Sequence, residues 1–268
     1  SACLVGSEMC IRDRAFTTIG TSGVVFAHTD NISIDPQGRV HTFCCAVPGA
    51  WHVMGVTQGA GLSLKWFRDN FCQAEKDTAA GMGVDPYVLM DQEAGQSPIG
   101  CNRLLYLPYL MGERTPHLDP DCRGVFFGLS AMHTKRDLLR AVMEGVTYSQ
   151  RDSVEILRGM GVELREMLAC GGGGTSPLWR QMLADTYNCP VKTVKSKEGP
   201  ALGVAILAGV GVGLYPSVQE ACQAMIQLNP AQEPIPENVP QYEAFYQVYK
   251  SLYPALKENY KLLAATGA

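Results

Sequence analysis

Four consecutive glycines, at 171–174, constrain this 268-residue chain more than any other feature. They follow a short apolar run at 167–170 and lead into a helix-like segment that begins at Pro177. A strand that breaks into glycines just before a helix is typical of α/β proteins that bind phosphate or nucleotide, because bare backbone lets N–H groups approach an anion. The run therefore predicts a nucleotide loop, with a purely structural turn as the alternative.

The residues after the glycines mark where the helix starts. Ser176 suits an N-cap, and Pro177 suits the first helical position, where its missing N–H and fixed φ cost nothing. The G-x-G-x-x-G fingerprint of dinucleotide sites fails here, because Ser176 stands at its third glycine. The loop is thus not predicted to bind a dinucleotide.

The composition is that of an ordinary globular protein with small-molecule partners. Hydrophobic residues make up 46% and charged residues 18%, which argues against disorder. The net charge is −4 and no basic run is present, so the sequence predicts no positively charged surface for a nucleic acid or an anionic membrane.

Two further features concern compartment and membrane. The ten cysteines are scattered without any C-x-x-C, which predicts a reduced, cytoplasmic protein. The longest apolar stretch, 201–214, is too short to span a bilayer and predicts a buried, closely packed helix.

Residues 1–14 show no helical or strand period. Positions 8–13 read EMCIRD, which resembles the translation of a sequencing adapter. We expect 1–14 to be an assembly artefact, the domain to occupy 15–268, and the natural protein to begin upstream.

The first half of the chain predicts antiparallel strands followed by helices. Strands are expected at 15–19, 24–28, 41–47 and 51–56, a helix at 59–71, a loop or short helical excursion at 77–96, and a buried strand at 104–110. A capping-box pattern of Thr134 and Asp137 predicts a long helix that ends near 159. In the polar loop at 112–120, an ion pair of Glu113 with Arg114 is expected.

The second half predicts a parallel arrangement. A strand at 166–170, a helix at 177–186, a strand at 191–194 and a helix at 199–209 give a β-α-β-α order. A proline-rich linker at 230–240 then precedes a terminal helix through 242–252. Together the two halves predict an α/β fold of the actin-like ATPase, ribonuclease H-like type.

Ordered sequence blocks carry a family resemblance. They read IGTSGV at 19–24, LPYLMGERTPH at 107–117, RGVFFGL at 123–129, GGG at 171–173, WRQMLAD at 179–185 and GPALG at 199–203. From residue 15 to its end the chain resembles the C-terminal domain of the FGGY carbohydrate kinases, most closely the xylulokinases.

The resemblance implies a nucleotide site. In this family two actin-like domains close on each other, and the C-terminal one holds most of the ATP, which is used with Mg²⁺. The residues that match the family's nucleotide-binding positions are Gly20, Thr21, Ser22, Gly23, Gly61, Gly171, Gly172, Gly173 and Ser176.

The resemblance also implies what this chain lacks. The family's general-base aspartate lies in a Gly-Asp-Asn segment of the N-terminal domain, together with the sugar site, so no catalytic residue and no metal ligand is assigned here. We expect the chain to be the ATP-binding half of a xylulokinase and to be inactive alone. Its expected partners are the nucleotide, the sugar and a missing N-terminal domain, and the full-length enzyme is expected to form a homodimer. The alternatives are half of a gluconate, ribulose or glycerol kinase, or a non-catalytic actin-like nucleotide-binding module.

Overall fold

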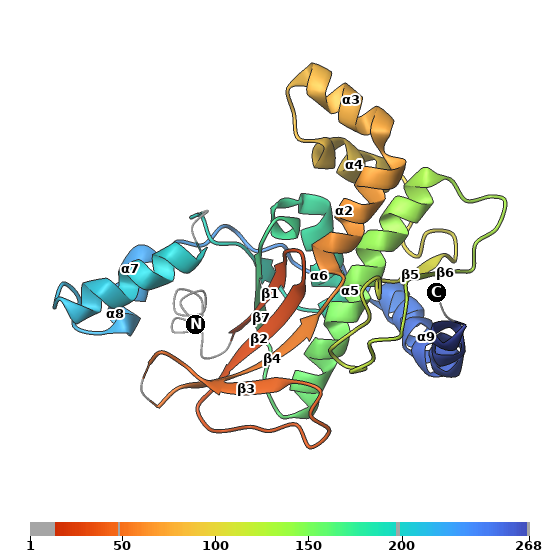
Figure 1. The fold of residues 1–268 in the computed structure, drawn as a ribbon. Coiled ribbons are helices and arrows are strands. Elements are labelled where there is room, and N and C mark those ends of the chain that lie inside the picture. Colours follow the sequence, from red (N-terminus) through yellow and green to blue (C-terminus); the bar gives the residue numbers. More distant parts are fainter. Residues whose placement is uncertain (1–13, 48, 197–198, 267–268) are drawn as a thin grey trace.

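A six-stranded mixed sheet forms the centre of the molecule (Figure 1). The computed structural model describes residues 14–47, 49–196 and 199–266. In spatial order β3-β4-β2-β1-β7-β8, the sheet consists of β1 (Arg14–Ile19), β2 (Gly23–Thr29), β3 (His41–Cys44), β4 (Trp51–Thr57), β7 (Glu166–Cys170) and β8 (Val191–Lys192). β1, β2, β4 and β3 pair antiparallel, whereas β1–β7 and β7–β8 are parallel. This confirms the antiparallel and parallel halves predicted from the sequence.

The described residues also form eight α-helices and a short two-stranded hairpin. The α-helices are α2 (Ala60–Phe71), α3 (Gln73–Met82), α4 (Pro86–Ala94), α5 (Lys135–Gly159), α6 (Pro177–Tyr187), α7 (Gly199–Gly211), α8 (Val218–Met225) and α9 (Val239–Ala265). The hairpin pairs β5 (Leu105–Leu107) with β6 (Val125–Phe127). The segment 77–96 is thus helical, while β6 and α8 are additions to the predicted elements. Arg14, grouped with residues 1–13 in the expected artefact, is the first residue of β1, and 1–13 lie outside the described residues.

Alternate residues of each strand face two different cores, as the period of a β-strand requires. Val25, Val53 and Met167 belong to the main core, together with side chains of α5 and α6. Phe16, Phe26 and Leu168 form a smaller cluster on the other face of the sheet.

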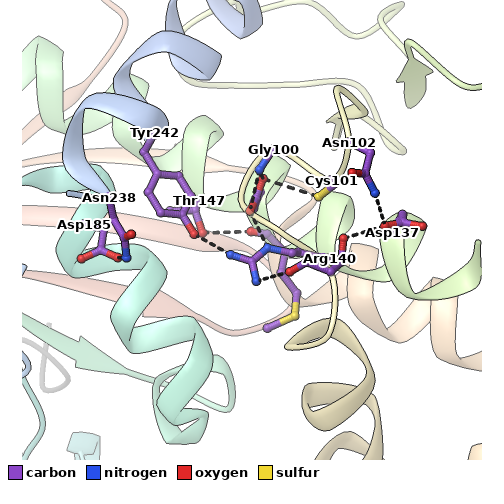
Figure 2. Close-up of polar contacts among 12 residues, drawn as sticks. Gly100, Cys101, Asn102, Asp137, Arg140, Thr147, Asp185, Asn238 and Tyr242 are labelled. Atoms are coloured by element: carbon purple, nitrogen blue, oxygen red, sulfur yellow. Dashed lines mark hydrogen bonds and ion pairs between the residues drawn. The ribbon is translucent and has the colours of Figure 1, made fainter. Parts of the chain in front are cut away.

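Helix α5 begins at the predicted capping box and holds the segment after α4 in place. The Asp137 carboxylate accepts a hydrogen bond from the backbone N–H of Thr134 (2.8 Å), as the box requires. The same carboxylate also accepts from Ser97 Oγ (2.7 Å) and Asn102 Nδ2 (3.1 Å), as Figure 2 shows for Asn102. The cap therefore also anchors residues 97–102.

One turn further along α5, the buried Arg140 ties three elements together (Figure 2). Its guanidinium donates to Glu144 Oε1 (2.7 Å), to the Ser97 carbonyl (2.8 Å) and to Tyr242 Oη (3.0 Å). The charge is thus paired within α5, and the remaining donors reach the segment after α4 and the start of α9.

A row of buried tyrosines attaches α9 to the body. Their spacing of four, three and four residues places them on one face of the helix, at Tyr242, Tyr246, Tyr249 and Tyr253. Tyr246 donates to Asp152 (2.7 Å), and Tyr253 donates to Asp119 (2.8 Å). The predicted terminal helix is therefore confirmed, and its hydroxyl groups satisfy acidic partners on α5 and on the polar loop.

Helix α7 confirms the helix predicted at 199–209, but the prediction that the apolar stretch 201–214 is buried and closely packed is wrong. Helix α7 packs against α8 through the buried Ile206, and the two helices share a small core of their own at one side of the sheet (Figure 1). Val204 is 52% exposed and Val212 is 82% exposed. The stretch is apolar all round, but α8 covers only part of its surface.

No disulfide bond joins any two of the eight described cysteines. Among the described residues, no helix is both long and apolar enough to span a bilayer.

Glu113 is bound differently from the ion pair expected with Arg114. Its carboxylate, 4% exposed, accepts from the backbone N–H groups of Arg114 (2.7 Å) and Gln58 (2.8 Å). Burial nevertheless raises the pKa of Glu113 from 4.5 to about 8. Burial also raises the pKa of the nearby Asp152 from 3.8 to about 7, although Tyr246 opposes the shift.

These raised pKa values predict a pH-dependent stability. Between about pH 4 and pH 8 the unfolded chain has ionised both carboxyls while the folded chain still holds their protons, so the free energy of unfolding falls as pH rises and levels off above the folded pKa values. We expect Glu113→Gln, which keeps an acceptor for both backbone N–H groups, to flatten this decline in urea unfolding. Glu258→Gln, at a side chain 77% exposed on α9, is the control and should leave the decline intact. An unchanged pH profile in Glu113→Gln would contradict the assignment.

Candidate functional site

A cavity of about 760 Å³ opens where four segments meet. They are the β1–β2 turn, the first half of α2, one side of α4, and the glycine loop after β7 with the start of α6. The lining residues span 160 positions of the sequence, from Ile19 to Trp179, and the parallel pairing of β1 with β7 brings the turn and the loop together.

The start of α2 is bonded to the β1–β2 turn. The N–H groups of Gly61 and Leu62 donate to the carbonyls of Gly20 (2.7 Å) and Thr21 (3.1 Å). These are N–H groups of the first helical turn, which have no partner inside the helix, and the N-cap Gly59 has no side chain to satisfy them. A Cβ added to Gly61 would lie 2.4 Å from the Gly20 oxygen, so only glycine permits this approach.

The glycine loop packs against the end of β1. Gly171 has φ +75°, and a Cβ there would lie 2.7 Å from the Ile19 oxygen. A Cβ on Gly173 would lie 2.5 Å from the Ile19 side chain, whereas one on Gly172 would meet nothing within 4 Å. Gly172 thus faces open space in the cavity, while its neighbours are glycines for reasons of packing.

Ser176 starts α6 as predicted. Its Oγ accepts from the Trp179 backbone N–H (3.0 Å), and Pro177 occupies the first helical position. The Ser176 hydroxyl also lies close enough to the Asp91 carboxyl to oppose the rise in the pKa of Asp91 that burial causes. This contact joins the glycine loop to α4.

Six of the nine residues singled out from the sequence line the cavity: Gly20, Thr21, Gly61, Gly172, Gly173 and Ser176. Gly171, Ser22 and Gly23 are not part of the lining. The Ser22 carbonyl accepts from the Gly20 N–H (3.1 Å) within the turn, and Gly23 is buried, with its Cβ position 2.5 Å from Thr57 Oγ1. The structure therefore places these three where they shape the turn and the loop.

Helix α4 supplies a wall that sequence reasoning missed. Its lining residues are Asp85, Tyr87, Val88, Asp91 and Gln92. The helix begins with Asp85 as N-cap, accepting from the Tyr87 N–H (2.9 Å), and with Pro86 at the first position. That Asp-Pro pair is the same start signal that Ser176 and Pro177 give, and it could have located the wall.

The lining combines two kinds of surface. Around Gly20, Gly61 and Gly172 it is bare backbone, which suits an anion, whereas Val88, Leu178 and their neighbours provide apolar faces. Among the described residues, no group of three or more His, Cys, Asp or Glu side chains is arranged to hold a metal ion. The cavity therefore suits an elongated ligand with a charged end and an apolar, flat end.

The sequence profile of the FGGY family of carbohydrate kinases, C-terminal domain, matches residues 15–212. The chain belongs to this family. Two curated relatives illustrate the match. A xylulose kinase of Staphylococcus epidermidis is 39% identical over 95% of this chain and 49% of its own length, and a gluconokinase of Bacillus subtilis is 34% identical over 92% and 48%.

This FGGY domain also superimposes on solved kinases. The ligand-bound xylulose kinase from Lactobacillus acidophilus gives a TM-score of 0.87 at 27% identity, over 98% of this chain and 51% of that one. The fold is thus the actin-like ATPase fold of the FGGY kinases, as predicted. The chain spans about half the length of the curated relatives it matches.

The close approach of Gly61 to Gly20 gives a test of how the site is built. Gly61→Ala must push the start of α2 away from the turn and stretch a 2.7 Å hydrogen bond, which should cost about 1–3 kcal/mol of stability. Gly81→Ala on α3, where a Cβ meets nothing within 4 Å, is the control and should be neutral or stabilising. Urea unfolding of both variants measures the difference, and equal stability would show that the two segments are not tightly joined.

Proposed function

We propose that this FGGY domain is the ATP-binding half of a carbohydrate kinase that transfers the γ-phosphoryl group of ATP to xylulose. The observation that carries the proposal is the cavity in which the β1–β2 turn and the glycine loop meet around Ile19. The xylulose kinases among its relatives support the choice of sugar.

In this proposal, backbone groups bind the phosphates. Gly20 and Gly172 leave room for a nucleotide against the main chain, and Gly173 adds backbone to the lining. The Thr21 hydroxyl adds a donor at the exposed turn, and Gly61 holds the turn in place. Ser22, Gly23 and Gly171 are outside the lining and set the course of the turn and the loop.

Two components of the reaction are assigned outside the residues of this cavity. Because the described residues offer no cluster of metal ligands, we propose that Mg²⁺ binds to the phosphates of ATP and arrives with the nucleotide. We propose that the general-base aspartate and the sugar contacts come from an N-terminal domain. Phosphoryl transfer depends on positioning and charge stabilisation by both walls of the cleft, so this half alone is expected to be inactive.

The remaining parts of the proposal concern the full-length enzyme. We propose a cytoplasmic kinase that works as a homodimer, which sedimentation of the full-length protein would test. A gluconate kinase is the second candidate, because a gluconokinase of Bacillus subtilis is 34% identical to this chain. Comparing phosphorylation of xylulose and gluconate by the full-length protein separates the two.

Gly172→Val tests the nucleotide site without disturbing the fold. A Cβ at Gly172 meets no protein atom within 4 Å, and its backbone is helical, at φ −59°, so the valine should project into the cavity. We expect ADP affinity to fall at least about tenfold, or about 1.4 kcal/mol, with an unchanged circular dichroism spectrum. Gly211→Val on α7, which also has free space around its Cβ, is the control. Equal ADP affinity in calorimetry would reduce the loop to a structural turn.

A fusion protein tests whether this domain binds ATP while an N-terminal domain supplies the general base and the sugar site. Joining an FGGY xylulokinase N-terminal domain, with its Gly-Asp-Asn segment, in front of Arg14, where β1 begins, should produce ATP-dependent phosphorylation of xylulose in a coupled ADP assay. Replacing the aspartate of that segment with alanine should abolish the activity, because it removes the general base. Turnover by the 268-residue chain alone would contradict the proposal.

A further inference from the structure

Asp91 stands out among the polar groups of the cavity. It lies on α4, is partly buried, and lines the cavity together with Ser176, whose hydroxyl interacts with its carboxyl. Ser176 Oγ accepts from the Trp179 N–H, so this hydroxyl is already used as the cap of α6.

The charged neighbours in the lining are engaged elsewhere. Lys65 Nζ lies 2.9 Å from Asp69, and Asp85 accepts the Tyr87 N–H at the start of α4. A carboxylate accepts hydrogen bonds at two oxygens with about four lone-pair sites and donates none when ionised. Asp91 thus presents unused acceptor capacity to the cavity.

Apolar groups surround this acceptor. Leu64, Val88, Pro177 and Leu178 line the same cavity as Asp91. Such a surface suits the faces of a heteroaromatic base, while a single polar group at the base's edge fixes its identity. The group available here is an acceptor, which pairs with a donor. On the adenine ring the donor is the exocyclic N6 amino group.

We propose that Asp91 accepts a hydrogen bond from the N6 amino group of adenine and makes the site selective for adenine nucleotides. This inference rests on the proposed ATP-binding function. Burial of the carboxyl raises the pKa of Asp91, and a donor bound at its free oxygens would favour the ionised form. A base without an amino group would leave this desolvated acceptor unpaired, which costs affinity.

The test compares two nucleotides that differ only at position 6 of the purine. The probes are ADP and purine riboside 5′-diphosphate, which carries hydrogen in place of the amino group, with binding to the full chain measured by calorimetry. We expect wild type to favour ADP about tenfold or more, since a hydrogen bond to an ionised carboxylate is stronger than one between neutral groups. In Asp91→Ala the preference should shrink to about twofold, because the acceptor is gone. Asp91→Asn keeps a neutral acceptor and should fall between the two.

Asp77→Ala, which removes an exposed carboxylate from α3, is the matched control and should keep the wild-type ratio. The ratio of two affinities distinguishes recognition of the amino group from a general loss of structure, which would weaken both nucleotides alike. The wild-type ratio also tests the inference without any variant, since equal binding of the two probes overturns it. Binding of ADP with an unchanged ratio in Asp91→Ala overturns the role of Asp91 alone. Failure of wild type to bind either nucleotide overturns the proposed nucleotide site and this inference together.

Discussion

The site depends on the close packing of backbone around the end of β1. Three glycines approach this point from different parts of the chain: Gly61 against the Gly20 carbonyl, Gly171 against the Ile19 carbonyl, and Gly173 against the Ile19 side chain. Each leaves less than 3 Å for a Cβ, so a side chain at any of them would force the segments apart. The geometry of the cavity is therefore set by the main chain.

The α4 wall is held by a different kind of contact. Helix α5 anchors the segment that follows α4 through Asp137, and Arg140 donates to the Ser97 carbonyl of the same segment. Arg140 and Glu144 are both buried, so removing either one would leave an uncompensated charge, at a cost of about 3–5 kcal/mol. The position of Asp91 relative to the glycine loop thus relies on a buried ion pair some distance from the cavity.

Local signals in the sequence predicted much of the fold. The capping box at Thr134, the cap at Ser176 and the strand periodicity of 15–19 and 24–28 all correspond to elements of the structure. These features depend on residues close in sequence, which is why they can be read from it.

The errors and omissions arise where distant segments meet. Nothing near 201–214 in the sequence shows that α8 covers one side of α7 and leaves Val212 exposed. The contact of Asp91 with Ser176 joins residues 85 positions apart, and so the α4 wall was missed. Six of the residues proposed for the site line the cavity, whereas Ser22, Gly23 and Gly171 do not. A glycine motif alone does not distinguish a residue that faces a ligand from one that packs against backbone.

The tyrosine face of α9 holds this helix on the body without the help of the backbone that connects it to α8. Tyr242, Tyr246 and Tyr253 join the helix to Arg140, Asp152 and Asp119 through hydrogen bonds that do not depend on the covalent link between α8 and α9. A nick in that connection would therefore leave α9 docked on the body. The chain is divisible there into two fragments that should associate on their own and complement each other.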